Sequence, residues 1–357
     1  MRLLITLDFP PEKGGIQRYL SDIVIHTFCA EDLVITGGSV YRHDGNDRIY
    51  PCRILRIGAW LTFVNKKLFL LPMVFLLLYH LVRHFRHLII YAGNIYTALV
   101  PGFISYVIPV HYCVYCYGTE LLPLKKKRSF RALVWKILLR RADTIYYLTK
   151  TTRTLLEHCS RCAPLIQMFP RIDLPDYRVC RKTDDNGYIH LLSVGRLVPH
   201  KGHAILIEAT ALLPKEIPWQ LTIVGDGPES RKLDLLVRQY SLEERIFLAG
   251  DVSTPELVEY YKAADIFVFP SVETESGIEG FGIVLLEAMA YGAAIVASCS
   301  ESIEEVVDNN SKYVELVQPG NSEALKNALT SLMADSERRF RMASAARQFL
   351  EERYVWK

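Results

Sequence analysis

Short apolar segments, each followed by a turn or by a helical pattern, recur along the second half of the chain. Strands are expected in five segments, of which the first two end in a glycine turn, namely Ile189–Arg196, Leu221–Pro228, Ile246–Gly250, Ala264–Ser271 and Ala294–Ala297. Strands that alternate with helices form parallel sheets, because each crossover between parallel strands uses a helix that covers a face of the sheet. The pattern predicts an α/β domain that binds its ligand beyond the carboxyl ends of the strands.

The first half of the chain repeats this alternation less regularly. After an apolar start at residues 1–7, strands are expected at Leu33–Thr36, Ile54–Ile57, Leu88–Tyr91, Val107–Tyr115 and Thr144–Leu148. A chain of 357 residues is longer than one hydrophobic core usually serves. The sequence therefore predicts two Rossmann-like domains with parallel sheets, residues 1–170 and 188–357, joined by a polar, proline-containing hinge at 171–187.

The two halves of the chain differ in charge. Through residue 175 there are 23 Lys+Arg against 11 Asp+Glu, and the remainder has 19 against 28. A basic half can face nucleic acid, anionic lipid or a phosphorylated substrate. No helix-turn-helix, zinc-finger or ribonucleoprotein motif accompanies it, so no nucleic-acid partner is expected.

Two segments of the basic half have the composition of a membrane-binding surface. Leu68–Val82 is an apolar run of 15 residues that contains Pro72, too short for a span of about 20 residues. Lys125–Arg141 combines basic residues with apolar residues at helical spacing. The alternatives are a core helix for the first segment and a solvated face for the second. Because no secretory signal is visible, we expect a cytoplasmic protein, either free or resting on the inner face of the membrane.

The cysteine pattern does not favour a metal site. Two Cys-x-x-Cys pairs, Cys113/Cys116 and Cys159/Cys162, have the residue types that bind zinc. Their separation is much wider than the usual spacing of about 15–20 residues, and the first pair falls within an expected buried strand. We therefore expect reduced thiols, no metal and no other cofactor.

A glycine-containing loop meets an apolar helix near residue 282. The residues whose backbone can approach an anion there are Gly280, Phe281, Gly282 and Ile283. A carboxylate stands on each side of this junction, Glu279 before it and Glu287 within the helix, and carboxylates accept hydrogen bonds from hydroxyl groups. A nucleotide sugar has both phosphates and hydroxyl groups. On their own, however, the two acids fit a solvated loop and helix equally well.

Other candidate ligand residues lie at the ends of expected strands. Arg196 and Lys201 flank one such turn and could neutralise a diphosphate, and Gly225 lies in the next turn. In the first half, Gly14 and Gly15 separate the first strand from a helix, a geometry suited to phosphate. A polar cluster with Tyr117 and Glu120 follows the end of another strand, where α/β sheets bind ligands. Alternatively, the cluster is a capped turn without a ligand. Tight turns without a ligand are the alternative for the glycines.

In this order and spacing, the motifs of the second half resemble the retaining glycosyltransferases of family 4, which have the GT-B fold. The motifs are Val194-Gly195-Arg196…Lys201-Gly202, Val224-Gly225-Asp226-Gly227, Ala264-Asp265…Pro270-Ser271 and Glu279…Glu287-Ala288-Met289-Ala290. The similarity covers nearly all of residues 189–308 and is weaker in the first half. Within the family, the sequence is most similar to bacterial members that act on lipid-anchored or envelope acceptors.

The resemblance implies two Rossmann-like domains that face a central cleft and a nucleotide-diphospho-sugar donor held mainly by the second domain. It implies that Glu287 holds the donor ribose, Glu279 the transferred sugar, and Arg196 and Lys201 the diphosphate, helped by the amides near Gly282. Gly14 and Gly15 would approach the distal phosphate, and Tyr117 and Glu120 would lie on the acceptor side. Transfer would retain configuration without a metal, to a lipid-linked or glycan acceptor. A nucleotide-sugar epimerase and a non-catalytic nucleotide-sugar-binding subunit are the alternatives.

Overall fold

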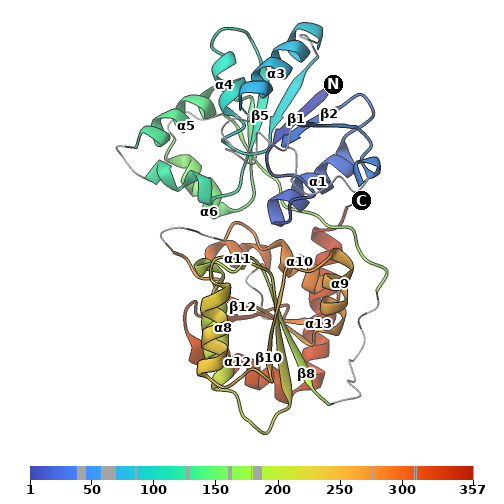
Figure 1. The fold of residues 1–357 in the computed structure, drawn as a ribbon, viewed down its shortest axis with the longest axis vertical. Helices are drawn as coiled ribbons and strands as arrows, with labels where there is room; N and C mark the ends of the chain where they lie inside the picture. Colours follow the sequence, from blue (N-terminus) through green and yellow to red (C-terminus); the bar gives the residue numbers. More distant parts are fainter. Residues whose placement is uncertain are drawn as a thin grey trace. The chain divides into compact units, whose positions relative to one another are not determined.

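The computed structural model describes residues 1–37, 46–57, 70–84, 87–125, 129–159, 163–177, 179, 187–274, 277, 279–308, 310 and 312–356. The chain divides into two compact units, Met1–Arg171 and Ile172–Lys357, which we call unit 1 and unit 2. Both are α/β units built on a parallel sheet (Figure 1), which confirms the predicted fold class.

The described part of unit 1 holds a seven-stranded sheet in the order β3-β2-β1-β4-β5-β6-β7, with all pairs parallel. Its strands are β1 (Arg2–Thr6), β2 (Leu33–Gly37), β3 (Arg53–Ile57), β4 (Ile89–Ala92), β5 (His111–Cys116), β6 (Thr144–Tyr147) and β7 (Leu165–Gln167). Its helices are α1 (Gly15–Thr27), α3 (Leu70–His84), α4 (Leu99–Ile104), α5 (Phe130–Arg141) and α6 (Lys150–Glu157), with 3-10 turns η1 (Asn46–Ile49) and η3 (Thr119–Lys125).

Unit 2 holds, in its described part, a six-stranded parallel sheet in the order β10-β9-β8-β11-β12-β13. Its strands are β8 (Ile189–Val194), β9 (Trp219–Val224), β10 (Ile246–Gly250), β11 (Ile266–Phe269), β12 (Ala294–Ser298) and β13 (Glu315–Val317). Its helices are η4 (Pro199–Lys201), α7 (His203–Ala211), α8 (Ser230–Gln239), α9 (Thr254–Ala263), α10 (Ile283–Ala290), α11 (Glu301–Val306), α12 (Ser322–Ala334) and α13 (Ser336–Arg353).

Each sheet has one point at which the strand order changes direction. In unit 1, β1 lies between β2 and β4, and in unit 2, β8 lies between β9 and β11. At such a point the loops after the two neighbouring strands turn to opposite faces of the sheet, which leaves a crevice at their carboxyl ends. A ligand site is therefore expected at the loops after β1 and β4 and at those after β8 and β11.

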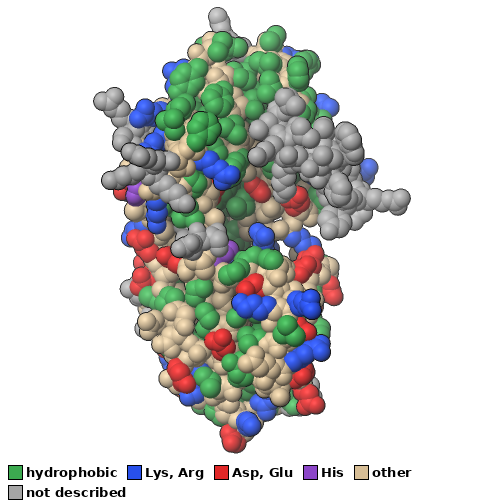
Figure 2. All heavy atoms as spheres, turned by 60° about the vertical axis from the view of Figure 1, so that its left-hand side comes forward, with side chains coloured by type: hydrophobic (Ala, Val, Ile, Leu, Met, Phe, Trp, Pro, Cys, Tyr) green, Lys and Arg blue, Asp and Glu red, His purple; other side chains and the backbone are tan. Residues whose placement is uncertain are grey.

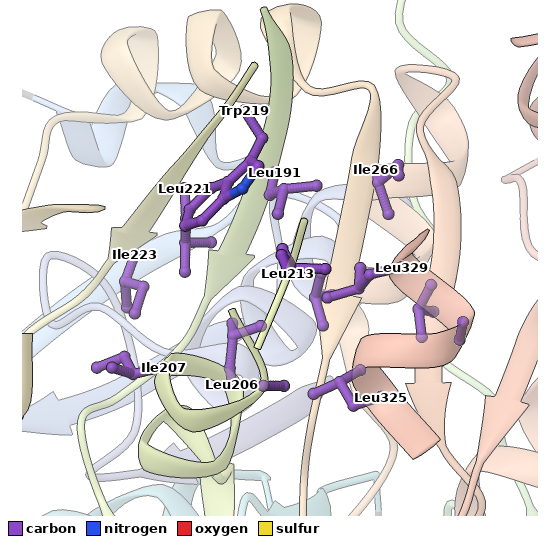
Figure 3. Close-up of a cluster of buried hydrophobic side chains, with 14 of the residues drawn as sticks. Leu191, Leu206, Ile207, Leu213, Trp219, Leu221, Ile223, Ile266, Leu325 and Leu329 are labelled. Carbon is purple, nitrogen blue, oxygen red and sulfur yellow. The ribbon is translucent and has the colours of Figure 1, made fainter. Parts of the chain in front are cut away.

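The core of unit 2 explains why these strands and helices form. Apolar residues of the strands and of helices α7 and α12 face each other in one buried cluster (Figure 3). Leu191 and Leu221 come from the sheet, Leu206 from α7 and Leu329 from α12. Burial of one such leucine contributes about 1.5–3 kcal/mol to stability. This packing fixes the sheet edge that carries the candidate site.

One expected strand begins later than predicted. The sequence predicted a strand at Val107–Tyr115, but β5 runs from His111 to Cys116. The amides of Val107 and Ile108 instead donate to the carbonyl of Ile104, at 2.9 Å each, and so extend the end of α4. Pro109 has no amide hydrogen to add to a sheet ladder. The prediction was wrong for these residues because their apolar character does not distinguish a helix end from a strand.

The apolar segment Leu68–Val82 corresponds to α3, with Leu68 and Phe69 outside the described residues. Its side chains Met73, Leu77 and Leu81 are buried, whereas Phe75, Tyr79 and Val82 are exposed. Helix α3 thus has one core face, as the core-helix interpretation predicted, and a second apolar face in solvent. In the described ranges no helix is long and apolar enough to cross a membrane.

Helix α5 makes up most of the basic segment Lys125–Arg141, whose residues 126–128 lie outside the described residues. Ser129 caps the helix by accepting the amide hydrogen of Ala132.

The cysteines of the two Cys-x-x-Cys pairs lie in unit 1. Cys113, Cys116 and Cys159 are buried, and Cys162 is not among the described residues. Among the residues that are described, no three His, Cys, Asp or Glu side chains gather as metal ligands.

Candidate functional site

The ammonium group of Lys201 donates a short hydrogen bond to the carboxylate of Glu279. Lys201 lies in the turn after β8, and Glu279 lies in the loop after β11. Both side chains are mostly buried, with 18% and 12% of their surface exposed. The Lys201 ammonium also stands 5.3 Å from the centroid of the Phe269 ring, a favourable distance for a cation over an aromatic face. The structure thus brings two predicted site residues, 78 positions apart, into one ion pair.

The backbone explains how these two loops come together. Gly202 has φ +70°, and a Cβ there would lie 1.9 Å from the carbonyl oxygen of Pro270. In addition, the amide of Val272 donates to the carbonyl of His200 at 2.8 Å. The turn after β8 therefore packs directly on the backbone that leaves β11. Only glycine combines this left-handed conformation with so close an approach.

Glu287 lies within α10 and is 7% exposed. The hydroxyl group of Tyr261, from α9, donates to its Oε2 at 2.6 Å. The Tyr261 ring stacks on Tyr291 with centroids 5.8 Å apart and an angle of 9° between the planes. A buried carboxylate held by a phenol has a fixed direction, because rotation would break the hydrogen bond. The second predicted acid is therefore a buried and oriented group, unlike a solvated helix residue.

Helix α10 begins at the loop that the sequence marked as an anion site. Gly282 precedes its first residue, Ile283, with φ +78°, and its carbonyl accepts the amide hydrogen of Leu285 at 2.8 Å. Gly280 is half-buried, and Phe281 is buried with its ring edge-on to Tyr354. The first turn of a helix carries a partial positive charge, which favours an anion.

Arg196 and His200 complete the polar surroundings of this region. Arg196 is exposed, and its guanidinium makes no ion pair with a described residue. Burial and the cation of Lys201 lower the pKa of His200, with a smaller contribution from Arg196 and an opposite one from Glu279. These four groups are therefore close enough to act on one another electrostatically, and Arg196 is the one whose charge is open to solvent.

Tight glycine turns set the position of Arg196. A Cβ on Gly225, whose φ is +137°, would lie 2.0 Å from the carbonyl oxygen of Gly195. The amide of Leu197 donates to the carbonyl of Asp226 at 3.0 Å. The turns after β8 and β9 thus lie against each other at backbone distance. In the structure Gly225 supports the Arg196 turn.

In unit 1, the predicted residues of the β5 end make contacts within the unit. The Tyr117 hydroxyl donates to the carbonyl of Gly93 at 2.7 Å, and burial raises the pKa of Tyr117 well above its usual value. The Glu120 carboxylate accepts the amide hydrogen of Tyr117 at 2.6 Å, as in a capped turn. Burial raises the pKa of Glu120, while backbone N–H groups lower it. Both residues lie at the carboxyl edge of the sheet, as predicted.

Gly14 and Gly15 open α1 at the same edge and are both exposed. Gly14 has φ +153°, and its carbonyl accepts the amide hydrogen of Arg18 at 3.0 Å. The strand–glycine–helix geometry expected from the sequence is therefore present after β1.

Two polar residues at this edge and one in unit 2 were not predicted from the sequence. Asp8, just after β1, accepts a hydrogen bond of 2.6 Å from the side-chain amide of Asn94, just after β4. Their position at the ends of neighbouring strands was the signal that could have found them. Tyr261 gave no such signal, because it sits in a helix and reaches Glu287 only through the fold.

Part of the chain matches a known protein family. Residues 181–349 match the family model described as Glycosyl transferases group 1. A GDP-mannose-dependent alpha-(1-6)-phosphatidylinositol monomannoside mannosyltransferase of Mycolicibacterium smegmatis is 26% identical over 389 residues, covering 99% of this chain and 95% of its own. The protein of the same name from Mycobacterium tuberculosis H37Rv is 31% identical over 170 residues, 46% of this chain and 44% of its own.

Among solved structures, HepE of Anabaena in complex with UDP-glucose has a TM-score of 0.78 to this chain at 21% identity. The similarity covers 99% of this chain and 96% of HepE. At this identity the likeness shows a shared fold.

Proposed function

We propose that this chain, whose residues 181–349 match the group 1 glycosyl transferases and whose two units have the parallel sheets typical of the GT-B fold, moves a sugar from a nucleotide-diphospho-sugar to a lipid-linked acceptor, with retention of configuration. The observation that carries this proposal is the group of Lys201, Glu279 and the oriented Glu287 at the strand-order change of the unit 2 sheet. Basic groups, acidic groups and a helix N-terminus thus all follow the two strands at this change of order, and a nucleotide sugar can use all three.

In the proposed donor complex the cations hold the diphosphate. Arg196 can donate two parallel hydrogen bonds to phosphate oxygens, and Lys201 supplies a point charge. Negative charge grows on the diphosphate as the bond to the sugar breaks, so donors fixed in place stabilise the transition state more than the bound substrate. The α10 N-terminus, from Gly280 to Ile283, adds its partial positive charge. In this way the protein side chains supply the electrostatic part of the catalysis.

The two acids are proposed to recognise hydroxyl groups. Glu287 would accept hydrogen bonds from the donor ribose, since Tyr261 holds its carboxylate in one direction. Glu279 would accept them from the transferred sugar, while its hydrogen bond from Lys201 holds the carboxylate in place. A carboxylate within a mostly buried ion pair binds a hydroxyl group more strongly than a solvated one, because little water competes.

Unit 1 is proposed to hold the acceptor, with Tyr117 and Glu120 on that side and Gly14 and Gly15 toward the donor phosphate. The acceptor class rests on the mycobacterial relative, whose name specifies a phosphatidylinositol monomannoside, at 26% identity. The same name specifies GDP-mannose, so GDP-mannose is the first donor to test. UDP-glucose is the second, because HepE was solved in complex with it. We propose that no metal takes part, since the two cations provide the charge neutralisation.

A donor screen followed by a transfer assay tests this function. A nucleotide sugar that binds the folded chain raises its melting temperature by mass action. The donor that stabilises the chain most is then supplied with its sugar radiolabelled, together with a lipid extract. Label in the lipid fraction supports the proposal. Donor binding without any transfer points to a non-catalytic binding subunit, and conversion of the sugar without an acceptor points to an epimerase.

A further inference from the structure

One side of unit 1 exposes many large apolar groups. Six of them, on α3, α4, α5 and the turn after α4, are Phe75, Tyr79, Val82, Phe103, Val107 and Phe130, and each is at least 53% exposed. We call them the apolar face. Figure 2 shows hydrophobic side chains gathered over the part of unit 1 turned toward the viewer. Soluble monomers rarely expose large contiguous apolar patches, and such patches mark interaction sites.

Helix α3 contributes a complete stripe to this face. Phe75, Tyr79 and Val82 are spaced by four and three residues, so they lie on one side of the helix. Their exposed fractions are 73%, 55% and 87%, although the buried stripe of α3 already packs in the core. A helix that is apolar on both sides needs a second apolar environment.

Helices α4 and α5 continue the face. The turn after α4 is fastened to α5, because the Arg141 guanidinium lies 4.7 Å from the centroid of the Tyr106 ring and donates to the carbonyl of Ser105. Val107, next in the chain, is 86% exposed, and Phe130 at the start of α5 is 80% exposed. These groups are held on ordered helices, which lowers the entropic cost of binding through them.

The charge of this region favours one kind of partner. Residues 70–141 contain ten Lys+Arg and a single acid, Glu120. The Glu120 carboxylate accepts the amide hydrogen of Tyr117 at the sheet edge. Arg83 donates to the Tyr79 hydroxyl at 2.9 Å, and the exposed Arg131 follows Phe130 directly. Basic groups thus adjoin the apolar face, and two copies of it would repel each other.

We propose that the apolar face rests on the surface of an anionic lipid bilayer. Its aromatic and aliphatic side chains would enter the boundary between headgroups and acyl chains, and its Lys and Arg side chains would meet lipid phosphates. Helix α3, with 15 residues, would lie along the surface and not cross it. The inference does not rest on the proposed sugar transfer, because binding to lipid is measured without donor or acceptor.

Vesicle sedimentation with the full-length chain tests the proposal. Vesicles of phosphatidylcholine alone are compared with vesicles that also contain about 30% phosphatidylglycerol, at low and at high salt. One variant carries Phe75→Ser and Phe130→Ser. Its matched control carries Leu235→Ser and Phe247→Ser, two apolar residues of unit 2 that are each 58% exposed. A second pair compares Lys125→Gln/Arg131→Gln with Lys215→Gln/Arg231→Gln, all exposed.

We expect the wild-type chain to sediment with anionic vesicles and to be released by salt. The Phe75/Phe130 variant should lose at least tenfold in partition coefficient, the Lys125/Arg131 variant about three- to tenfold, and both controls should stay within twofold of wild type. All four variants should keep the wild-type melting temperature, since every altered side chain is exposed. A wild-type chain that stays in solution with anionic vesicles would overturn the proposal. So would equal losses in variant and control, or a wild-type dimer that the Phe75/Phe130 change converts to a monomer.

Discussion

The hydroxyl group of Tyr261 donates a 2.6 Å hydrogen bond to Glu287, and both side chains are buried. The two residues come from consecutive helices, α9 and α10, on either side of strand β11. The phenol stabilises the carboxylate and fixes its direction. Tyr261 is therefore a positioning residue for the acid that we propose binds the donor ribose.

Tyr261→Phe removes this hydrogen bond and keeps the ring. A hydrogen bond to a charged group is worth about 1.5–3 kcal/mol, so the KM for the donor should rise roughly tenfold or more while kcat changes little. Steady-state kinetics with varied donor measure both constants. Tyr240→Phe, on the exposed end of α8, is the matched control and should behave as wild type. A lowered kcat with unchanged KM would contradict the positioning role.

The Lys201–Glu279 pair allows stability and catalysis to be separated. Lys201→Met leaves a mostly buried carboxylate without its cation, so the free energy of unfolding should fall by about 1–3 kcal/mol. Adding Glu279→Gln should recover most of that loss, because neither charge then remains unpaired. Transfer should be lost in the single and in the double variant. Urea unfolding measures the stability of each variant, and a transfer assay on the same samples measures its activity. Recovery of activity in the double variant would refute a direct role for Lys201.

Gly202→Ala tests the contact that joins the two site loops. The added Cβ would collide with the Pro270 carbonyl in a left-handed conformation, so we expect a loss of at least about 2 kcal/mol in the free energy of unfolding. Gly320→Ala is the control: its φ is +75°, and a Cβ there would have no atom within 4 Å. That variant should lose only about 1 kcal/mol, the cost of the conformation alone. Equal losses would mean that the approach to Pro270 matters little.

His203, the first residue of α7, makes stability depend on pH. Burial lowers its pKa to about 3, with a further contribution from Lys201, so the ring is neutral in the folded chain near neutral pH. The unfolded chain has a histidine pKa near 6.5 and binds a proton that the folded chain does not, so stability falls as pH drops below about 6.5. Between pH 7 and pH 5 the wild type should lose about 2 kcal/mol more than His203→Gln. Parallel losses in urea unfolding would show that His203 does not titrate in this way.

The sequence predicted the two α/β units and the strand-end location of the candidate residues because both follow from local patterns. Gly202 and Gly282 could be recognised for the same reason. The partner of each charged group could not be predicted, since Lys201 meets Glu279 only when β8 and β11 become neighbours in the sheet. The Tyr261–Glu287 bond has the same origin. The start of β5 was misjudged because Val107 and Ile108 are apolar without being in a strand.

Transfer of labelled sugar from the best donor to the lipid fraction, measured for wild type, Glu279→Ala and Arg196→Ala, shows whether this site carries out the transfer. Arg231→Ala, an exposed arginine of unit 2, serves as the control. We expect the two site variants to lose about a hundredfold or more in kcat/KM, because each removes a group that would contact the reacting part of the donor. The control should keep the wild-type rate. Wild-type transfer by both Glu279→Ala and Arg196→Ala would contradict the assignment of the site.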